Sequence, residues 1–465
     1  MKSIFLNKFG RREFLRTSAY GVALLSLPQI SLAQSNPDVV VIGAGASGLA
    51  ATAKLIKEGK SVICIEAMNR IGGRCYTDNS IFGVPYDLGA HWLHDYSINQ
   101  LAKYGKNFKD EFTIYKDPDR AKVYDGRKKV NGKKLWDLYY KIKKIKKRVS
   151  SYDEPLINHI PEEIQNHEWY DTVQKQITTR DLNNYTPFDD WFNYKIWGEG
   201  DGFVKEGYGT LLSHYRKGVP VKLNIVANEI KWDGKNIKVE TNNGTITAKA
   251  CIVTVSTGVL NSGKIKFTPK LPDQKYAAFE NINMSNYLRV ALQLDKKFYK
   301  KFGFKKDTYL VTKVDNQKSI SPKTFNGVMK VCGTNLSWFH AKGQFAKDLD
   351  NAGNKVILDL VINRLKSTFG SEFKEKYLIK SHITDWINNP YTLGTWSGAI
   401  PGKASYRDIL KKSVGDKIFF AGEATSDSWS TVHGADRRGE RVASDVASVV
   451  FGQNTYSDDE FILKT

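Results

Sequence analysis

Cysteine is scarce in this chain of 465 residues, and the four cysteines, Cys64, Cys75, Cys251 and Cys332, are widely separated without a CxxC motif. This spacing argues against a disulfide framework and against a structural zinc site. Internal repeats and low-complexity tracts are also lacking. Beyond the first 33 residues no apolar run approaches the ~18 residues of a membrane-spanning helix. We therefore expect a soluble mature protein that has no bound metal and no transmembrane anchor.

The composition is that of a globular protein, with 41% hydrophobic and 26% charged residues. These values exclude a disordered or collagen-like chain, and the length predicts about three domains. Aromatic residues make up 12% of the chain, enough to line a large apolar site. The formal net charge of +21 favours long-range attraction of anions, and it counts against a polycationic substrate.

The first 33 residues resemble an export signal. The basic segment Gly10–Arg16 contains the pair Arg11-Arg12 followed by Phe-Leu, and an apolar stretch then ends in Ser31-Leu32-Ala33. A basic start, a short apolar run and a small-residue exit are typical of a signal peptide. The paired arginines resemble a bacterial twin-arginine signal. We expect folded export by the twin-arginine machinery, cleavage near Ala33 and a periplasmic location. The alternatives are an ordinary basic N-terminus or an uncleaved anchor.

A dinucleotide-binding unit follows the leader. The β-branched run 38–42 predicts a buried strand that opens into the glycine-rich turn 43–48, and a helix over 49–58 and a second strand over 61–65 come next. The first glycine suits a tight turn, the second allows a pyrophosphate to approach the backbone, and the third allows close packing of helix and strand. The helix N-terminus presents free N–H groups to the phosphates. Glu66 comes at the end of the second strand, where its carboxylate can accept hydrogen bonds from the ribose hydroxyls. An acidic residue here disfavours the 2′-phosphate of NADP.

Two segments beyond Glu66 favour FAD over NAD. Residues 70–74 read Arg-Ile-Gly-Gly-Arg, and residues 86–94 read Tyr-Asp-Leu-Gly-Ala-His-Trp-Leu-His. With these motifs the sequence resembles the flavin-containing amine oxidases, which comprise monoamine oxidases, polyamine oxidases and lysine-specific histone demethylases. The resemblance, together with the glycine-rich turn, implies FAD contacts at Gly43, Gly45, Ala46, Ser47, Gly48, Glu66, Ala67, Gly73, Arg74, Gly89, Ala90, His91 and Trp92.

The C-terminal part carries a second motif for the same cofactor. A predicted strand over 417–421 leads into Gly-Glu-Ala-Thr-Ser, and Thr-Val-His-Gly-Ala precedes a helix predicted over 439–450. These segments resemble the family's C-terminal FAD motif. The segment 221–230 resembles the strand pair whose valine contacts adenine, and 384–397 resembles the segment that places aromatic rings at the flavin. The implied contacts are Val226, Trp386, Gly422, Glu423, Val432 and Ala435.

The resemblance also implies a substrate site. In the family two side chains beside the flavin form walls for the substrate, and motif alignment places these walls at Trp396 and Thr431. Trp396 would otherwise be an ordinary core residue. His94 occupies the position of a polyamine oxidase histidine that approaches the substrate amine. An ordinary pKa of ~6.5 would make it a neutral hydrogen-bond partner, and a purely structural histidine remains the alternative.

Two positions depart from the family. Arg289 stands where most members have a lysine that bridges to the flavin through water. Arginine can donate a hydrogen bond but does not lose its proton, which puts that bridge and the rate of reoxidation by oxygen in question. Thr395 stands where monoamine oxidases have a cysteine bonded to the flavin. We therefore expect FAD to be held non-covalently.

The expected fold class is α/β. A discontinuous Rossmann-like FAD-binding domain would comprise residues 36–95, 204–285 and 396–452, and an α+β substrate domain residues 96–203 and 286–395, with a tail at 453–465. The first insert reads as helical and includes the basic stretch 141–148. We favour a solvated helix face for this stretch over an anion or membrane contact. Asp189, Asp190, Glu199 and Asp201 either attract a cationic substrate or form a charged loop.

These observations predict an FAD-dependent enzyme that oxidises a primary or secondary amine, most like polyamine oxidases. Its products would be an aldehyde or ketone, a smaller amine and hydrogen peroxide, with O2 as the oxidant. The first alternative is an L-amino-acid oxidase, which needs an arginine clamp for the substrate carboxylate; Arg289 is a conceivable substitute. The second is a flavoprotein without turnover that serves in binding or electron transfer. No nucleic-acid partner is expected.

Overall fold

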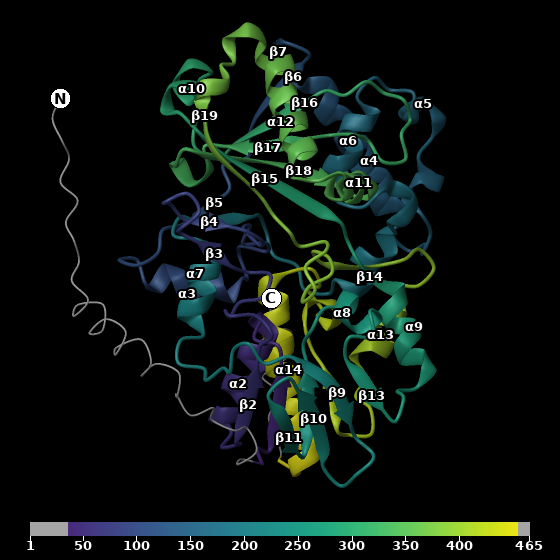
Figure 1. Cartoon of the computed structure of the whole chain (residues 1–465). Helices are drawn as coiled ribbons and strands as arrows, with labels where there is room; N and C mark the ends of the chain where they lie inside the picture. Colours follow the sequence, from purple (N-terminus) through teal and green to yellow (C-terminus); the bar gives the residue numbers. More distant parts are fainter. Residues whose placement is uncertain (1–35, 454–465) are drawn as a thin grey trace, which may run out of the picture.

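The structure is a computed structural model that describes residues 36–453. The expected leader at 1–33 and nearly all of the expected tail lie outside the described residues. In Figure 1 the elements from both ends of the described chain, coloured purple and yellow, lie together in the lower half of the molecule. The upper half is built mainly from the middle of the sequence. The two predicted cofactor motifs are therefore brought together by the fold.

A parallel four-stranded sheet forms the centre of the lower half, with the strand order β2-β1-β12-β21. Its strands are short and apolar, as expected for a parallel sheet covered on both faces. The alternating side chains of β1 enter two different cores. The strands are β1 (Val39–Ile42), β2 (Val62–Ile65), β12 (Ala250–Val253) and β21 (Ile418–Phe420).

Helices α2 (Ala46–Lys57) and α14 (Val432–Phe451) cover one face of this sheet. They approach so closely that a Cβ atom on Gly439 would lie 2.1 Å from the carbonyl oxygen of Ser47. Helix α14 begins seven residues before the predicted start at Gly439. The reason is a cap: the Thr431 hydroxyl accepts a hydrogen bond from the Gly434 N–H at 3.0 Å.

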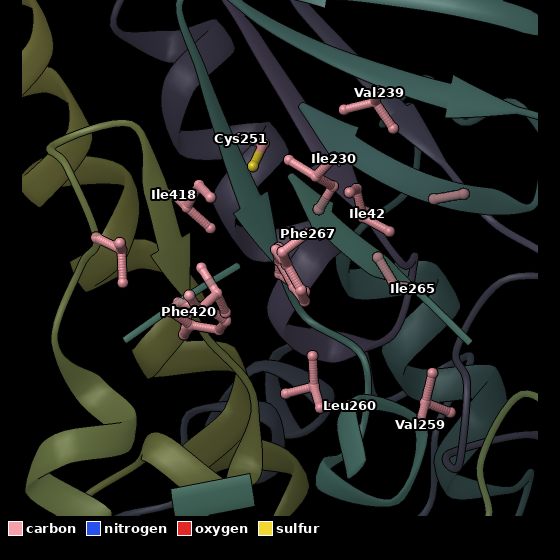
Figure 2. Close-up of a cluster of buried hydrophobic side chains, with 14 of the residues drawn as sticks. Ile42, Ile230, Val239, Cys251, Val259, Leu260, Ile265, Phe267, Ile418 and Phe420 are labelled. Carbon is pink, nitrogen blue, oxygen red and sulfur yellow. The ribbon is translucent and has the colours of Figure 1, made fainter. Parts of the chain in front are cut away.

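A second four-stranded sheet covers the other face, in the order β11-β10-β9-β13. Figure 2 shows the core between the two sheets, where Ile42, Cys251, Ile418 and Phe420 meet Ile230 and its neighbours. The segment predicted as a strand from residue 221 becomes regular only at Ala227. The strands are β9 (Ala227–Lys231), β10 (Ile237–Thr241), β11 (Gly244–Ala248) and β13 (Lys266–Thr268).

A seven-stranded sheet dominates the upper half, in the order β19-β15-β18-β17-β16-β6-β7. It joins segments from both inserts, because β6 pairs in parallel with β16. The insert 96–203, expected to be helical, thus also contributes strands. The strands are β6 (Arg120–Asp125), β7 (Lys128–Val130), β15 (Tyr287–Leu294), β16 (Thr308–Thr312), β17 (Asn326–Met329), β18 (Leu336–Lys342) and β19 (Leu378–Ile383).

The side chains of β15 point alternately to the two faces of the sheet, and only those on one face reach the site. Leu288, Val290 and Leu292 pack into a core with Val361 of α12 (Asn354–Phe369). Tyr287 and Arg289 carry the opposite parity and therefore point to the other face. The helices α10 (Lys296–Lys301) and α11 (Gln344–Ala352) complete the core on the α12 side.

The remaining elements are short strand pairs and helices. The pairs are β3 (Thr77–Asp78) with β4 (Tyr86–Asp87), β5 (Ile114–Lys116) with β8 (Gly202–Val204), and β14 (Ile282–Met284) with β20 (Ser397–Ala399). The helices are α3 (Gln100–Asn107), α4 (Lys133–Arg148), α5 (Glu162–Gln165), α6 (Tyr170–Ile177), α7 (Tyr208–Tyr215), α8 (Thr257–Asn261), α9 (Asp273–Asn281) and α13 (Tyr406–Lys411). Within residues 36–453 no helix is both long and apolar enough to cross a membrane.

Candidate functional site

One large cavity of about 1360 Å³ lies between the two halves of the molecule. Its walls come from the glycine-rich turn, the segments after β2 and β4, and the C-terminal motif. The face of the seven-stranded sheet that carries Tyr287 and Arg289 completes them. All residues predicted as cofactor contacts line this cavity except Gly48, and the four predicted substrate-site residues line it as well. The fold thus brings together side chains more than 380 positions apart in the sequence.

The glycine-rich turn is shaped to leave space at Gly45. A Cβ atom added at Gly45 would meet nothing within 4 Å, whereas one at Gly48 would lie 1.8 Å from the carbonyl oxygen of Gly43. Gly43 itself has a φ of +102°, in the left-handed region that favours glycine. Gly48 is therefore needed by the turn itself, while the open space beside Gly45 is available to a ligand.

The start of α2 adds unsatisfied donors to this space. The first N–H groups of a helix have no intrahelical partners, and the N-cap residue Gly45 has no side chain to accept hydrogen bonds from them. The Ser47 hydroxyl is buried, lines the cavity and has no hydrogen-bond partner in the described structure. Such an arrangement is suited to the phosphate groups of a dinucleotide.

Glu66 fastens the turn to the end of β2. One carboxylate oxygen accepts the Ala44 N–H at 2.7 Å and the other accepts the Met68 N–H at 2.9 Å. Burial raises the pKa of Glu66 above its usual value, against the opposing effect of these hydrogen bonds. Each oxygen retains a second lone pair. Glu66 can therefore hold the turn and also accept hydroxyl groups of a ligand in the cavity.

Arg74 and Glu423 tie the first cofactor motif to the last. The Arg74 Nη1 atom lies 3.0 Å from Glu423 Oε1 and also donates to the carbonyl oxygen of Thr395 at 2.8 Å. The other oxygen of Glu423 accepts the Ser397 hydroxyl at 2.8 Å. Trp386 is fixed by a 2.9 Å hydrogen bond from its indole N–H to the Leu88 carbonyl. FAD fits a site with this open turn, the unpaired Ser47 hydroxyl and the Arg74–Glu423 linkage. Thr395 cannot form a thioether bond to FAD.

His94 is paired with Asp201 in the cavity wall. The bridge between Leu93 and Gly202, with N–H to carbonyl distances of 2.8 and 3.1 Å, brings the two side chains together, and their Nδ1 and Oδ1 atoms lie 2.8 Å apart. Burial alone would lower the pKa of His94, but the Asp201 carboxylate outweighs burial and raises it above 6.5. The expectation of an ordinary pKa for His94 is therefore wrong.

Arg289 occupies a buried position in the cavity wall. Its guanidinium lies 4.5 Å from the centre of the Trp338 ring and donates to the backbone carbonyl of Asp87, while Nε has no partner in the described structure. The side chain of Asp87 holds His91, with 2.9 Å between Oδ2 and Nδ1. Both members of this pair are buried. The site thus carries a fixed positive charge where the family lysine is expected.

Trp396 lines the cavity beside a tyrosine that sequence reasoning missed. The Tyr287 ring lies 5.1 Å from the Trp396 ring, and the Tyr287 hydroxyl is hydrogen-bonded to His340. Burial, and then the charges of Lys342 and Arg289, hold the pKa of His340 well below its ordinary value, so its imidazole is neutral. The sequence signal for Tyr287 is its place two residues before Arg289 on the same strand. Thr431 also borders the cavity, and it caps α14.

The basic stretch 141–148 is only partly a solvated face. Helix α4 buries one stripe in its own core, and a second stripe with Trp136, Tyr139, Lys143 and Lys146 lines the cavity. These positions follow the helical repeat of three to four residues. Lys141, Lys144, Lys147 and Arg148 are exposed as expected. The favoured interpretation is therefore wrong for Lys146, which is half-buried and paired with Asp190, whereas Lys143 borders the cavity but stays exposed as expected.

The acidic cluster near residue 190 is mostly engaged in ion pairs. Asp189 binds the buried Arg407, with Nε 2.6 Å from Oδ1, and Asp190 binds Lys146 at 2.6 Å. Asp201 binds His94, and Glu199 is exposed. Arg407 and Lys146 neutralise Asp189 and Asp190, whereas Asp201 is neutralised only when His94 is protonated. Among the described residues no group of three or more acidic, histidine or cysteine side chains is arranged to hold a metal ion.

Comparison with known proteins identifies two family profiles in this chain. A profile described as flavin containing amine oxidoreductase matches residues 187–447, and one described as NAD(P)-binding Rossmann-like domain matches residues 41–105. Polyamine oxidase 4 of Oryza sativa subsp. japonica is 28% identical over 462 residues, covering 91% of each chain. Polyamine oxidase 2 of Arabidopsis thaliana is 28% identical over 444 residues, covering 88% of each.

Solved structures share the fold. Wild-type putrescine oxidase bound to putrescine superposes with a TM-score of 0.69 at 18% identity, covering 89% of this chain and 99% of that one. Cyclohexylamine oxidase from Brevibacterium oxydans IH-35A superposes with a TM-score of 0.70 at 19% identity and the same coverage. At such identities the likeness concerns the fold, and the expected α/β class with a Rossmann-like domain is confirmed.

Proposed function

The chain belongs to the family of flavin-containing amine oxidoreductases, and we propose that it oxidises the C–N bond of a primary or secondary amine. The amine becomes an imine, and O2 is reduced to H2O2. Water hydrolyses the imine to a carbonyl compound and a smaller amine, or ammonia where the substrate is a primary amine. The observation that carries the proposal is one continuous cavity that contains both the dinucleotide cradle and the wall formed by His94, Asp201 and Trp396.

FAD, when bound, supplies the hydride acceptor, and the protein supplies binding and orientation. The residues suited to hold it are those of the turn at Gly43–Gly48, Glu66, the Arg74–Glu423 linkage and Trp386. We propose non-covalent binding, because position 395 is threonine. We also propose the discontinuous domain division at residues 36–95, 204–285 and 396–452, which the path of the chain through the lower sheets supports.

The chain's own residues orient the substrate. Trp396 and Tyr287 form an aromatic wall whose rings lie 5.1 Å apart. His94 Nδ1 is engaged with Asp201, so Nε2 is the nitrogen that remains for a substrate amine. In its neutral form Nε2 accepts a hydrogen bond from the amine, or its proton. C–H cleavage beside an amine requires such alignment of the substrate.

The test is anaerobic addition of spermidine, putrescine, tyramine and amino acids to the purified holoenzyme. Relatives named polyamine oxidases make the polyamines the first substrates to examine. We expect loss of the flavin band, and aerobic formation of aldehyde and H2O2. If no amine bleaches the flavin, the protein is a flavin-binding or electron-transfer module, for which the arginine at 289 is the supporting feature.

We propose periplasmic residence after export by the twin-arginine route, which the Arg11-Arg12 segment and the exit at Ser31–Ala33 support. Replacing Arg11 and Arg12 by lysine should leave the full-length protein in the cytoplasmic fraction. A matched replacement of Lys2 and Lys8 by arginine should still be exported. Export of the first variant at the normal rate would refute the twin-arginine assignment.

A further inference from the structure

The charged side chains in the cavity outside the cofactor cradle are unequally neutralised. The lining carboxylates Asp190 and Asp201 are paired with Lys146 and His94 at 2.6 and 2.8 Å. Asp95 lies 3.2 Å from His433, but burial lowers the pKa of His433, so this partner is a neutral imidazole. The lining lysines Lys143, Lys264 and Lys342 have no carboxylate partner among the described residues, but Lys143 and Lys264 are exposed to solvent. Asp119 is the exception among the acids, and it is exposed at the edge of the cavity. Among the described residues, Lys342 is therefore the one enclosed lysine of this wall without a carboxylate partner.

Lys342 is the most enclosed of these cations. It ends β18 directly opposite Tyr287 of β15. Its ammonium donates one hydrogen bond, to the carbonyl oxygen of Lys175 at 2.8 Å, and the described chain provides no other partner for it. An ammonium group has three donors, so two remain. Burial, and then the charge of Lys175, lower the pKa of Lys342 to about 8.

Capping of α6 explains only part of this arrangement. Lys175 lies in the last turn of α6, where a cation is favourable. The hydrogen bond from Lys342 to the Lys175 carbonyl is sufficient to cap the helix. Capping does not explain why the neighbouring Gln176 lacks a hydrogen-bond partner. The Nε2 atom of Gln176 is buried without a hydrogen-bond partner, and Gln176 lines the same cavity. The wall thus offers the remaining N–H donors of the Lys342 ammonium, which binds the Lys175 carbonyl, and the unpaired amide N–H donors of Gln176, the residue that follows Lys175.

The Lys342 donors lie across the sheet from the aromatic wall formed by Tyr287 and Trp396. Tyr287 stands beside Trp396 on one side, and its strand neighbour across the sheet is Lys342. Because these side chains line one cavity, a linear molecule whose amine lies beside Trp396 can extend past Tyr287 toward Lys342. Carboxylates are the ligands that best match paired ammonium and amide donors.

We propose that the substrate is an amine that also carries a carboxylate, and that Lys342 and Gln176 bind this carboxylate while the amine lies at His94. The proposal rests on the amine oxidation proposed above and names its substrate class. It assigns the basic stripe of α4 a role in attracting the anionic end, since Lys143 lines the same cavity. The reaction is unchanged: the C–H bond beside the nitrogen is oxidised and the carboxylate takes no part.

The experiment compares matched substrates on the holoenzyme. The probes are 5-aminopentanoate and 1,5-diaminopentane, which share a five-carbon chain, with 4-aminobutyrate and putrescine as the four-carbon pair. The rate of anaerobic flavin reduction at limiting substrate should be about 10- to 100-fold higher for the carboxylates, as expected for a charge-assisted contact. Lys342→Met should abolish this preference, and Lys342→Arg should retain most of it. Lys144→Gln, on the exposed face of α4, is the matched control and should behave as wild type.

A binding measurement separates this inference from the oxidation itself. Pentanoate carries the carboxylate but no amine, and it should perturb the absorption of the oxidised holoenzyme and bind about 10-fold or more weakly to Lys342→Met. Faster reduction by the diamines overturns the inference and leaves the amine oxidation standing. Pentanoate binding that is equal in wild type and Lys342→Met overturns it as well. If no amine reduces the flavin, the proposed function fails and the substrate assignment falls with it.

Discussion

The Nδ1 atom of His94 lies 2.8 Å from Oδ1 of Asp201, and both side chains face the cavity beside the dinucleotide cradle. The hydrogen bond fixes Nδ1 as the nitrogen engaged with the carboxylate, and it leaves Nε2 for the substrate. Because the carboxylate stabilises the cationic imidazole, His94 holds its proton to higher pH than a free histidine. A protonated His94 repels an ammonium substrate, so this pair couples substrate binding to pH.

Asp201→Asn should move the acid limb of the kcat/KM profile to lower pH. The amide lacks the negative charge that raises the pKa of His94, so the imidazole stays neutral further into the acid range. The plateau should fall by about 100-fold, because the amide no longer fixes the orientation and tautomer of the ring. The matched control is Asp119→Asn, which removes a cavity carboxylate that has no histidine partner. An unshifted acid limb in Asp201→Asn would show that His94 does not govern it.

Gly45→Ala and Gly48→Ala should separate cofactor binding from folding. A methyl group at Gly48 collides with the Gly43 carbonyl, so this variant should lose stability with or without FAD. A methyl group at Gly45 enters open space, so the apoprotein should melt as wild type does while its FAD affinity falls by about 10-fold or more. Thermal denaturation of apoprotein and titration with FAD measure the two effects. Equal FAD affinity in Gly45→Ala and wild type would place the pyrophosphate elsewhere.

Arg289→Met should make the bound flavin harder to reduce. The buried guanidinium supplies positive charge that favours the electron-rich form of the cofactor. Its loss should lower the midpoint potential by on the order of 30 mV, about 1.4 kcal/mol for a two-electron couple. Arg289→Lys keeps the charge and should retain the potential. A potential unchanged in Arg289→Met would mean that the arginine serves only to hold Asp87 and Trp338.

Asp189→Asn should destabilise the fold strongly at neutral pH. Burial alone would raise the pKa of Asp189, but Arg407 outweighs it and the pKa lies below the usual 3.8. A depressed folded-state pKa means that the stabilisation is complete above about pH 4 and is lost as the pH falls through the folded-state value. The free energy of unfolding should fall by about 3–5 kcal/mol at pH 7, with a smaller difference in acid. Asp408→Asn, at an exposed ion pair, should change it by less than about 1 kcal/mol.

The cofactor cradle could be predicted from sequence because its motifs are local. A strand, a glycine-rich turn, a helix and Glu66 follow one another within 30 residues, and each has its own pattern of residue types. The C-terminal motif is equally compact. Helix α14 was predicted to start too late because its cap is a hydrogen bond from Gly434 to the Thr431 side chain, and the glycine at 434 suggests a break by propensity alone.

The substrate wall was harder to predict because it is made by tertiary pairing. Tyr287, His340 and Lys342 lie on two strands of one antiparallel pair, and only the register reveals that they share a wall with Trp396. Asp201 was seen as one of four acids, but its partnership with His94 depends on the bridge between Leu93 and Gly202. The division of the α4 lysines into cavity and solvent faces depends on which stripe of the helix is buried.

The visible spectrum of the purified protein, followed by anaerobic titration with an amine, tests most directly whether both ends of the chain hold one redox-active FAD. The account predicts a flavin band at about 450 nm that is lost as substrate is added. It also predicts that denaturation releases one FAD per chain. Colourless protein that takes up no FAD on incubation would contradict it.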